Sequence, residues 1–315
     1  MKFKKRVYGA VSIKSKMANF NADFTGRPKS ISRGEYFASD KAVKFPMKYM
    51  WDKDGEKVMY IRSYTETENK KKEKKIVPRT LSERYEYLFE TEINKKDSNE
   101  VMGNLFSCID VLNFGATFAE GGQNLSITGA VQFNQGMNKY SETKVITQDI
   151  LSPFKDATSE DAQMTSIGKK IVTDEAHYIY GFSVNPKSYE EYENIVEGFE
   201  GYSEEAYEKF KEAALISTTA LNTNSKFGCE NELGIFVETK EDSKMYLPDI
   251  SNFIEFSKSE KDVFDLNKLE FLNDYIEEIE KIEIYYNEFL TEIKMEKLNK
   301  LPIKLMNIYT KKEVE

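Results

Sequence analysis

The chain has 315 residues, 40% of them hydrophobic and 31% charged, and a net charge of −9. That length and composition fit a globular protein with a sizeable buried core and exclude a fibrous or intrinsically disordered chain. No stretch approaches ~18 uninterrupted apolar residues, so we predict no membrane-spanning helix and no membrane partner. The apolar run at Val7–Ile13 follows a basic start but lacks a convincing cleavage site, so we expect a cytoplasmic protein.

Charge is distributed unevenly along the chain. Residues 1–79 hold 21 Lys and Arg against nine Asp and Glu, which leaves 24 basic and 45 acidic residues in the remainder. Such asymmetry indicates a segment that binds a polyanion. It would also let the basic region of one copy meet the acidic region of another copy.

The first predicted element is a strand at Val7–Ile13, whose alternating apolar positions are typical of a half-buried strand. A polar loop with Asn19, Asn21 and Asp23 follows and passes through a Gly-Arg-Pro turn. Asn and Asp favour tight turns because their side chains bond nearby backbone. We therefore expect Asp23, a lone loop carboxylate, to bond its own turn.

A helix is predicted from Lys41, with Ser39-Asp40 as its N-cap and with Pro46 expected to end or kink it early. Its lysines at 41, 44 and 48 recur at intervals of three and four, so they share one helix face. Further along, we predict a hairpin at Lys53–Tyr64, a solvated loop at Asn69–Lys75, and helices at Thr80–Thr91 and Ser98–Leu112.

The segment from Gly115 to Gly136 is rich in glycine and includes a predicted strand at Ser126–Phe133. It contains neither G-x-x-x-x-G-K-[ST] nor G-x-G-x-x-G, which excludes a nucleotide-binding loop of either kind. Met137–Lys170 is long and weakly periodic, and we predict a protruding hairpin or arm there.

The remaining predicted elements complete a fold of the α+β class, because strands interleave with helices without repeated β-α-β units. They are a strand at Ala176–Val184, helices at Tyr189–Glu197 and Ser203–Ala220, a strand at Leu233–Glu238, and a helix over Asp265–Leu298.

The two cysteines and the single histidine offer little catalytic chemistry. Cys108 and Cys229 are far apart and form no C-x-x-C pair, so we expect buried reduced thiols. His177 lies in a predicted strand without a Cys or a second His nearby, so we expect a packed or hydrogen-bonded side chain. We therefore predict no metal site and no cofactor.

The basic residues of the N-terminal region form a constellation with interleaved aromatic residues. Lys and Arg neutralise phosphates without reading sequence, and aromatic rings stack on bases exposed in single strands. The basic residues are Lys14, Lys16, Arg27, Lys29, Arg33, Lys41, Lys44 and Lys48, and the aromatic residues are Phe20, Phe24, Tyr36 and Phe45.

Five segments occur in an order that resembles a known family. They are N-F-N-A-D-F-T-G-R-P from Asn19, S-D-K-A-V-K-F-P-M-K from Ser39, C-I-D-V-L-N-F-G-A-T-F from Cys108, S-I-T-G-A-V-Q-F from Ser126 and H-Y-I-Y from His177. This set resembles the repeated CRISPR RNA-binding backbone subunit of type I CRISPR (Cascade) complexes, closest to type I-B, in the RAMP superfamily. The match spans roughly residues 5–240.

The resemblance implies an RRM-like (ferredoxin-like) palm with C-terminal helices, formed by residues 1–33, 100–136 and 171–315. It implies a fingers insertion at 34–99 and a thumb hairpin at 137–170. Copies would form a helical filament along CRISPR RNA together with other Cascade subunits. The guide would be held for pairing with target DNA in antiviral defence, and no catalytic residue is required.

The constellation and the resemblance together predict a set of RNA-binding residues. They are Lys14, Lys16, Asn19, Asn21, Arg27, Lys29, Ser39, Lys41, Lys44, Lys48, Gln132, Met164, Ile167 and Lys169.

Two alternatives stay open. One is an enzyme, a backbone subunit like those of type III complexes, which would cleave RNA with Asp23 and a divalent metal. Metal-assisted cleavage normally needs more ligand oxygens than one carboxylate supplies. The other is a protein-binding scaffold in which the basic segment is a solvated face.

Overall fold

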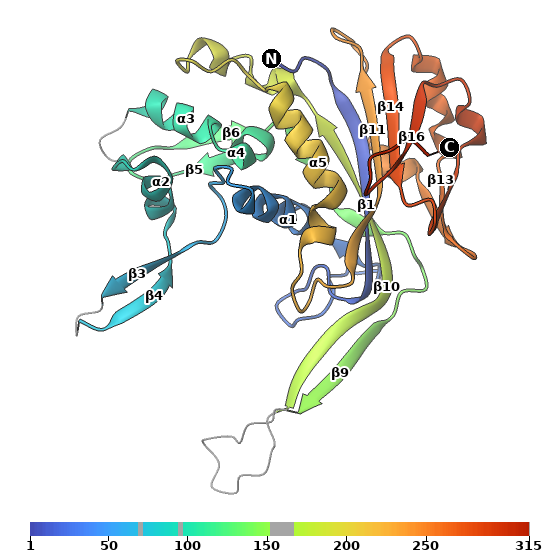
Figure 1. Ribbon diagram of the computed structural model, residues 1–315, viewed down its shortest axis with the longest axis horizontal. Helices are drawn as coiled ribbons and strands as arrows, with labels where there is room; N and C mark the ends of the chain where they lie inside the picture. The colour runs from blue at the N-terminus through green and yellow to red at the C-terminus, as the bar shows by residue number, and fades with distance from the viewer. Residues whose placement is uncertain (69–71, 94–96, 152–166, 315) are drawn as a thin grey trace, which may run out of the picture.

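The computed structural model of the chain describes residues 1–68, 72–93, 97–151 and 167–314. Within them the α+β architecture expected from the sequence is built around one nine-stranded sheet (Figure 1). Its strands are β1 Val7–Ala18, β2 Phe37–Ala38, β7 Val131–Phe133, β8 Gly136–Asn138, β9 Val145–Leu151, β10 Ile167–Val184, β11 Cys229–Thr239, β14 Ile279–Tyr286 and β16 Ile303–Asn307. Their order is β16-β14-β11-β1-β10-β8-β2, and β7 and β9 also pair with β10.

Strand β1 lies between β10 and β11 and is antiparallel to both. Val7, Val11 and Ile13 belong to one hydrophobic core, and Tyr8 and Ala10 belong to a second core. The strand is therefore buried on both faces, and the predicted half-buried strand is wrong in this respect. The alternation of Val7, Val11 and Ile13 identified one buried face of the strand. The other face is covered by residues far away in sequence.

Each face of the sheet is covered by its own layer. Helices α1 (Asp40–Lys53) and α5 (Glu204–Ala220) lie on one face (Figure 1). The C-terminal part of the chain lies on the other face, where β12 (Glu255–Lys258), β13 (Asp262–Asp265) and β15 (Thr291–Lys294) form a separate sheet. This second layer encloses the core that contains Tyr8 and Ala10.

Helix α1 continues seven residues past Pro46, so the prediction that this proline ends the helix early is wrong. A proline removes one N–H donor and crowds the preceding turn. Here the buried stripe of Val43, Met47 and Trp51 runs through the proline and packs into the core, which offsets that cost. The helix thus remains a rigid support for the loop that precedes it.

The predicted hairpin at Lys53–Tyr64 is also absent. Lys53 ends α1, and Gly55 takes a left-handed φ of +88° just after it, so the Lys-Asp-Gly sequence terminates a helix. A hairpin follows later, formed by β3 (Tyr64–Glu68) and β4 (Lys74–Pro78), and it includes part of the predicted solvated loop.

Helix α2 (Leu81–Phe89) confirms the helix predicted at Thr80–Thr91, and Thr80 and Glu83 form a capping box at its start. The helix predicted at Ser98–Leu112 is divided in two. Helix α3 (Ser98–Phe106) ends at Ser107, and α4 (Ile109–Phe114) begins after an extended Cys108.

The glycine-rich segment allows two backbone segments to pack closely together. It forms β5 (Gly115–Phe118), β6 (Leu125–Thr128) and then β7, so the predicted strand at Ser126–Phe133 is interrupted. A Cβ on Gly129 would lie 2.2 Å from the Phe114 carbonyl carbon and 2.3 Å from the Gly115 nitrogen. Two backbone segments therefore approach so closely that only glycine fits at Gly129.

The helices predicted at Tyr189–Glu197 and Asp265–Leu298 are wrong. The first region contains short 3-10 helices that begin at Pro186. The second contains a 3-10 helix at Asn267–Tyr275, then β14, β15 and a 3-10 turn at Glu296–Leu298. In β14 the side chains alternate, and the strand pairs with β11 on one side and β16 on the other. These pairings with distant strands override the helical spacing of the leucines and isoleucines.

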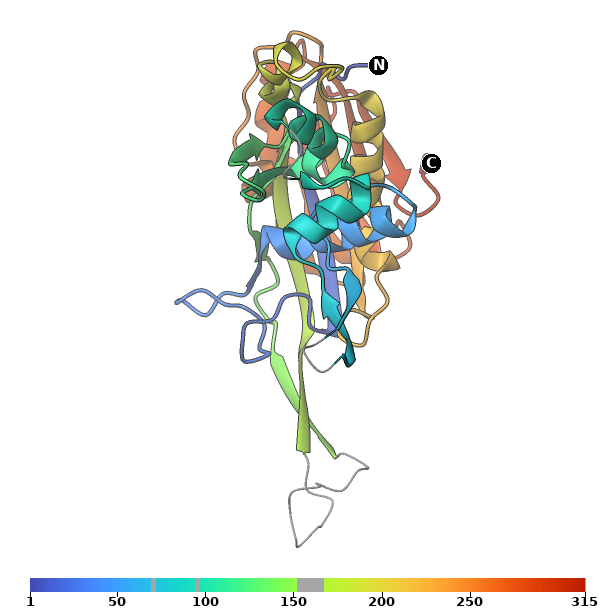
Figure 2. The same ribbon diagram turned by 90° about the vertical axis from the view of Figure 1, so that its left-hand side faces the viewer.

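Strands β9 and β10 form a long antiparallel hairpin, with Leu151 opposite Ile167 and Val145 opposite Thr173. It extends away from the rest of the molecule (Figures 1 and 2). A protruding hairpin was predicted within Met137–Lys170, and the strands confirm it. Among the described residues, none of the helices has the length and apolar content needed to span a membrane.

Candidate nucleic-acid interface

The loop between β1 and β2, residues 19–36, is organised by Asp23. Its Oδ1 accepts hydrogen bonds from Thr25 N at 2.7 Å, from Thr25 Oγ1 at 2.7 Å and from Arg27 N at 3.0 Å. The hydrogen bonds from Thr25 lower the pKa of the Asp23 carboxyl. This confirms that Asp23 bonds its own turn, and it places Arg27 at the far side of that turn.

Two asparagines attach this loop to the elements around it. Asn19 Nδ2 donates to Gly26 O at 2.9 Å and to Ile171 O of β10 at 3.0 Å. Asn21 Oδ1 accepts from Ser39 N at 2.9 Å, at the residue that precedes α1. Asn19 is only 7% exposed, so its side chain supports the loop from beneath.

The end of β1, the loop and the start of α1 present cations that form no ion pair with any carboxylate that the structure describes. In the described part of the chain, no carboxylate comes within ion-pair distance of them. They are Lys16, Arg27, Lys29, Arg33 and Lys41, of which only Lys29 is partly covered. Phe24, at the tip of the first turn, is fully exposed. Free cations beside an exposed ring are the elements that single-stranded nucleic acid binds.

Lys44 and Lys48 of α1 are partly covered and already have partners within the protein. Lys44 Nζ lies 3.1 Å from Asp40 Oδ2, and Lys48 Nζ lies 3.9 Å from Asp110 Oδ2. Lys48 also donates to Tyr60 O at 3.4 Å, and burial lowers its pKa. The predicted lysine face is therefore divided, because Lys44 and Lys48 connect α1 to its surroundings and Lys41 remains open.

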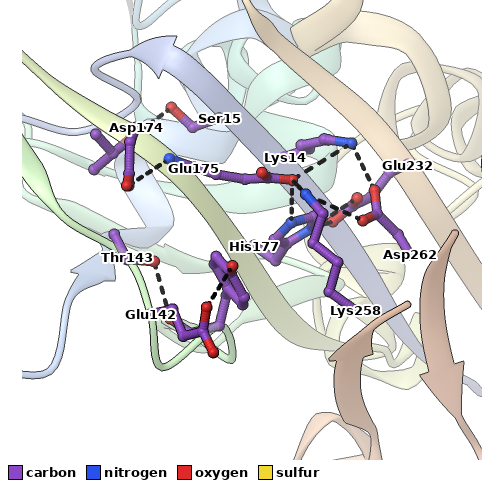
Figure 3. A network of polar contacts seen from close by, with 12 residues as sticks. Lys14, Ser15, Glu142, Thr143, Asp174, Glu175, His177, Glu232, Lys258 and Asp262 are labelled. Carbon is purple, nitrogen blue, oxygen red and sulfur yellow. Dashed lines mark hydrogen bonds and ion pairs between the residues drawn. The ribbon is translucent and has the colours of Figure 1, made fainter. Parts of the chain in front are cut away.

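Lys14 belongs to a polar network on the other side of the molecule (Figure 3). Its Nζ lies 2.6 Å from Asp262 Oδ2, and its side chain is only 12% exposed. Burial opposes the charged form, but the hydrogen bond to Asp262 and the negative charges of Asp262, Glu232 and Glu175 together outweigh it and raise the pKa of Lys14. The charge of Lys14 is thus already paired inside the protein, and its contact with RNA stays a prediction.

His177 lies in the same network and is fully buried. Its Nδ1 is 2.9 Å from both carboxylate oxygens of Glu232, and its Nε2 is 3.3 Å from Glu175. The ring stacks on Phe256 with a centroid distance of 3.9 Å. The expectation of a packed, hydrogen-bonded histidine is confirmed.

The network also has the composition of a metal site, because Glu175, His177 and Asp262 each place one potential ligand atom within 4.8 Å of the others. Two ammonium groups already occupy it, however. Lys14 bonds Asp262, and Lys258 bonds Glu175 (Figure 3). A metal would have to displace both lysines, so we interpret the cluster as a salt-bridge network that joins the sheet to β12 and β13.

The remaining predicted contacts that the structure describes lie at opposite ends of β10, because Gln132 is opposite Ser183 whereas Ile167 and Lys169 are opposite β9. Gln132 is exposed on β7, and its Nε2 donates to Gly129 O at 2.9 Å. Lys169 is exposed on β10 opposite Asp149, and Ile167 begins that strand. Met164 lies outside the described residues.

Sequence reasoning missed one cation at the base of the loop. Lys226, in the turn between α5 and β11, donates through Nζ to Asn19 O at 2.9 Å and to Phe20 O. The two segments are about 207 residues apart, and nothing in the local sequence indicates this contact. Both cysteines are buried and unpaired, as expected.

Comparison with solved structures shows which folds this fold is similar to. The fold resembles a chain of a CRISPR RNA-guided surveillance complex in a pre-nicking state, with a TM-score of 0.52, 14% sequence identity, and coverage of 92% of this chain and 96% of that one. A chain of another CRISPR RNA-guided surveillance complex has a TM-score of 0.48, 15% identity and 91% coverage of both chains. Comparison with curated protein sequences gave no match.

The family model described as CRISPR-associated protein Cas7 matches residues 5–283. The chain therefore belongs to the CRISPR-associated protein Cas7 family.

Proposed function

We propose that this chain is the backbone subunit of a type I, and specifically type I-B, Cascade complex, and that it polymerises along CRISPR RNA. Family membership supports the assignment to such a complex, as does a fold shared with a chain of an RNA-guided surveillance complex. On this proposal the partners are CRISPR RNA, further copies of the chain, other Cascade subunits, and target DNA paired to the guide. The complex would work in the cytoplasm, where the guide is available.

The observation that carries the proposal is the group of unneutralised cations on the 19–36 loop and the first turn of α1. A backbone subunit grips phosphates and leaves sequence reading to base pairing, so it needs charge held in a fixed geometry. The Asp23 turn and the bond from Ser39 N to Asn21 supply that fixed geometry. The proposed interface consists of Lys16, Arg27, Lys29, Lys41, Gln132, Ile167 and Lys169, with Asn19, Asn21 and Ser39 supporting the loop and Lys44 and Lys48 contributing from α1.

We further propose that the domain division follows the family. The palm would be residues 1–33, 100–136 and 171–315, the fingers residues 34–99 and the thumb residues 137–170. A protruding hairpin next to a basic loop would let one copy reach the RNA held by its neighbour, and contacts between unlike faces of successive copies generate a helical filament.

The proposal is tested by charge reversal at open cations. Arg27→Glu with Lys41→Glu should lower the affinity for guide-length RNA by at least about tenfold at moderate salt. Each phosphate contact releases counterions from the RNA, and the loss of a contact removes this favourable contribution to binding. Lys297→Glu, on the far C-terminal segment, is the matched control and should leave affinity unchanged. Equal affinity of the double variant and the wild type would favour the solvated-face alternative.

We also propose that the subunit is not catalytic. Asp23 Oδ1 already accepts three hydrogen bonds from its own turn, and metal-assisted cleavage normally needs more ligand oxygens than one carboxylate supplies. An enzyme of the type III kind would lose metal-dependent RNA cleavage on Asp23→Ala. We expect bound RNA to stay intact in the wild type with Mg²⁺ or Mn²⁺ present.

A further inference from the structure

The turn between α5 and β11, residues 222–228, is fastened to the start of the 19–36 loop. Asn19 N donates to Ser225 O at 3.0 Å, and Lys16 N donates to Gly228 O at 2.8 Å. The turn also meets the hairpin, because Lys170 Nζ lies 3.5 Å from Asn224 Oδ1. This turn therefore lies where the basic loop and the base of the β9–β10 hairpin come together.

Lys226 is the charged residue of this turn, and its side chain is partly buried against the loop. Its Nζ donates to the carbonyl oxygens of Asn19 and Phe20 and lies 5.3 Å from the centroid of the Phe20 ring. These partners are polar or aromatic but carry no negative charge. Burial lowers the pKa of Lys226, as expected for an ammonium group that has lost water without gaining an anion.

Three other lysines, whose side chains are at most 14% exposed, are neutralised internally. Lys14 pairs with Asp262 at 2.6 Å, Lys44 with Asp40 at 3.1 Å, and Lys211 with Glu283. Within the described part of the chain, Lys226 has no carboxylate within ion-pair distance. A partly buried charge without a counter-charge reduces stability, and such charges occur preferentially where function uses them.

We propose that Lys226 is a phosphate-binding residue of this subunit and that an RNA phosphate seated beside Asn19 and Phe20 supplies its missing counter-charge. The ammonium carries three N–H donors, and two of them are occupied by the two carbonyl oxygens. The third donor is available to a phosphate oxygen. Phe227, 76% exposed on the same turn, offers a ring beside that position. This inference rests on the proposed RNA-binding function and adds the 222–228 turn to its interface.

The test separates a phosphate contact from a merely structural lysine through salt dependence. For single-stranded nucleic acid, each neutralised phosphate contributes about −0.7 to the slope of log K against log salt. Lys226→Met should therefore make the slope less steep by about 0.7 and lower affinity for guide-length RNA several-fold. Lys226→Arg keeps the charge and should keep the wild-type slope. An unchanged slope in Lys226→Met, with the wild type binding normally, would overturn the inference.

A second measurement uses the wild-type protein, so it does not depend on the variant folding. Amine-reactive labelling followed by mass spectrometry compares each lysine with and without RNA, and Lys297 serves as the unprotected control. Guide-length RNA should protect Lys226 together with Lys41. Protection of Lys41 without protection of Lys226 would overturn this inference alone, whereas protection of neither would overturn the proposed function as well.

Discussion

Lys14 and Asp262 are about 248 residues apart, yet Lys14 Nζ lies 2.6 Å from Asp262 Oδ2. The pair joins the central strand β1 to β13 in the layer that covers the second core. Only two residues further along β1, Lys16 is exposed and has no carboxylate partner among the described residues. We therefore expect these two neighbouring lysines to have separate roles, one in stability and one in RNA binding.

Substitution of these lysines should separate the two roles. Lys14→Met leaves the buried Asp262 carboxylate with only Lys258, whose Nζ is 3.8 Å from Asp262 Oδ1, and should lower the free energy of unfolding by about 2 kcal/mol. RNA affinity, measured under conditions where the variant is folded, should change less than twofold. Urea unfolding and RNA titration check the two expectations.

Lys16→Met is the matched control for that experiment. The side chain is exposed, so its loss should change stability by no more than about 0.5 kcal/mol. RNA affinity should fall instead. If Lys14→Met weakened RNA binding more than Lys16→Met, the assignment of Lys14 to the internal network would be wrong.

Acid should weaken the contact between α5 and β14. Burial alone would raise the pKa of Glu283, but the hydrogen bonds and positive charges of Lys211 and Lys281 together outweigh it and hold the pKa below its usual value. A lowered folded-state pKa contributes stability that is present above the unfolded-state pKa and is lost as pH falls through the folded-state pKa. Glu283→Gln should therefore reduce stability at neutral pH. The variant should also lose less stability than the wild type as the pH falls from about 5 to about 3. Urea midpoints across that range provide the check, and parallel curves for variant and wild type would contradict it.

Gly129 should not tolerate a side chain. A Cβ there would overlap the backbone of Phe114 and Gly115, so Gly129→Ala should lower the free energy of unfolding by about 3 kcal/mol or prevent folding. Gly168→Ala is the control, since the nearest atom to its added Cβ would be 3.7 Å away. Similar melting temperatures for the two variants would show that the segment near Gly129 can rearrange.

Asp23 should matter for loop geometry and not for chemistry. Asp23→Ala removes three hydrogen bonds to Thr25 and Arg27 and should weaken RNA binding several-fold. Asp23→Asn keeps an oxygen acceptor and should restore most of the affinity. Gel analysis of the bound RNA should show the same intact length for all three proteins, and metal-dependent shortening only in the wild type would establish cleavage.

Short sequence patterns correctly predicted the features that depend on neighbouring residues. The helix predicted at Thr80–Thr91 is α2, and Asp23 organises its own turn as its residue type suggested. The ordered motifs indicated a CRISPR backbone subunit, and the Cas7 family match over residues 5–283 confirms the family. Each of these features depends on residues close together in the chain or on a resemblance of whole segments.

Features set by distant partners were missed. One helix was predicted over Asp265–Leu298, but the 3-10 helix there ends at Tyr275, and β14 beyond it is fixed by pairing with β11 and β16. Lys14 and Lys48 look like free cations until Asp262 and Asp110 are brought beside them. The sequence could therefore locate the basic region, but only the folded arrangement shows which of its charges are free.

The most direct test of the account is assembly on RNA. The purified chain is mixed with a cognate-length CRISPR RNA, and the mass of the particle and the 260/280 nm absorbance ratio are recorded before and after RNase treatment. We expect multi-copy particles that RNase dissolves and that Arg27→Glu with Lys41→Glu does not form. A wild-type protein that stays monomeric with its guide RNA, or particles that the double variant forms equally well, would contradict the account.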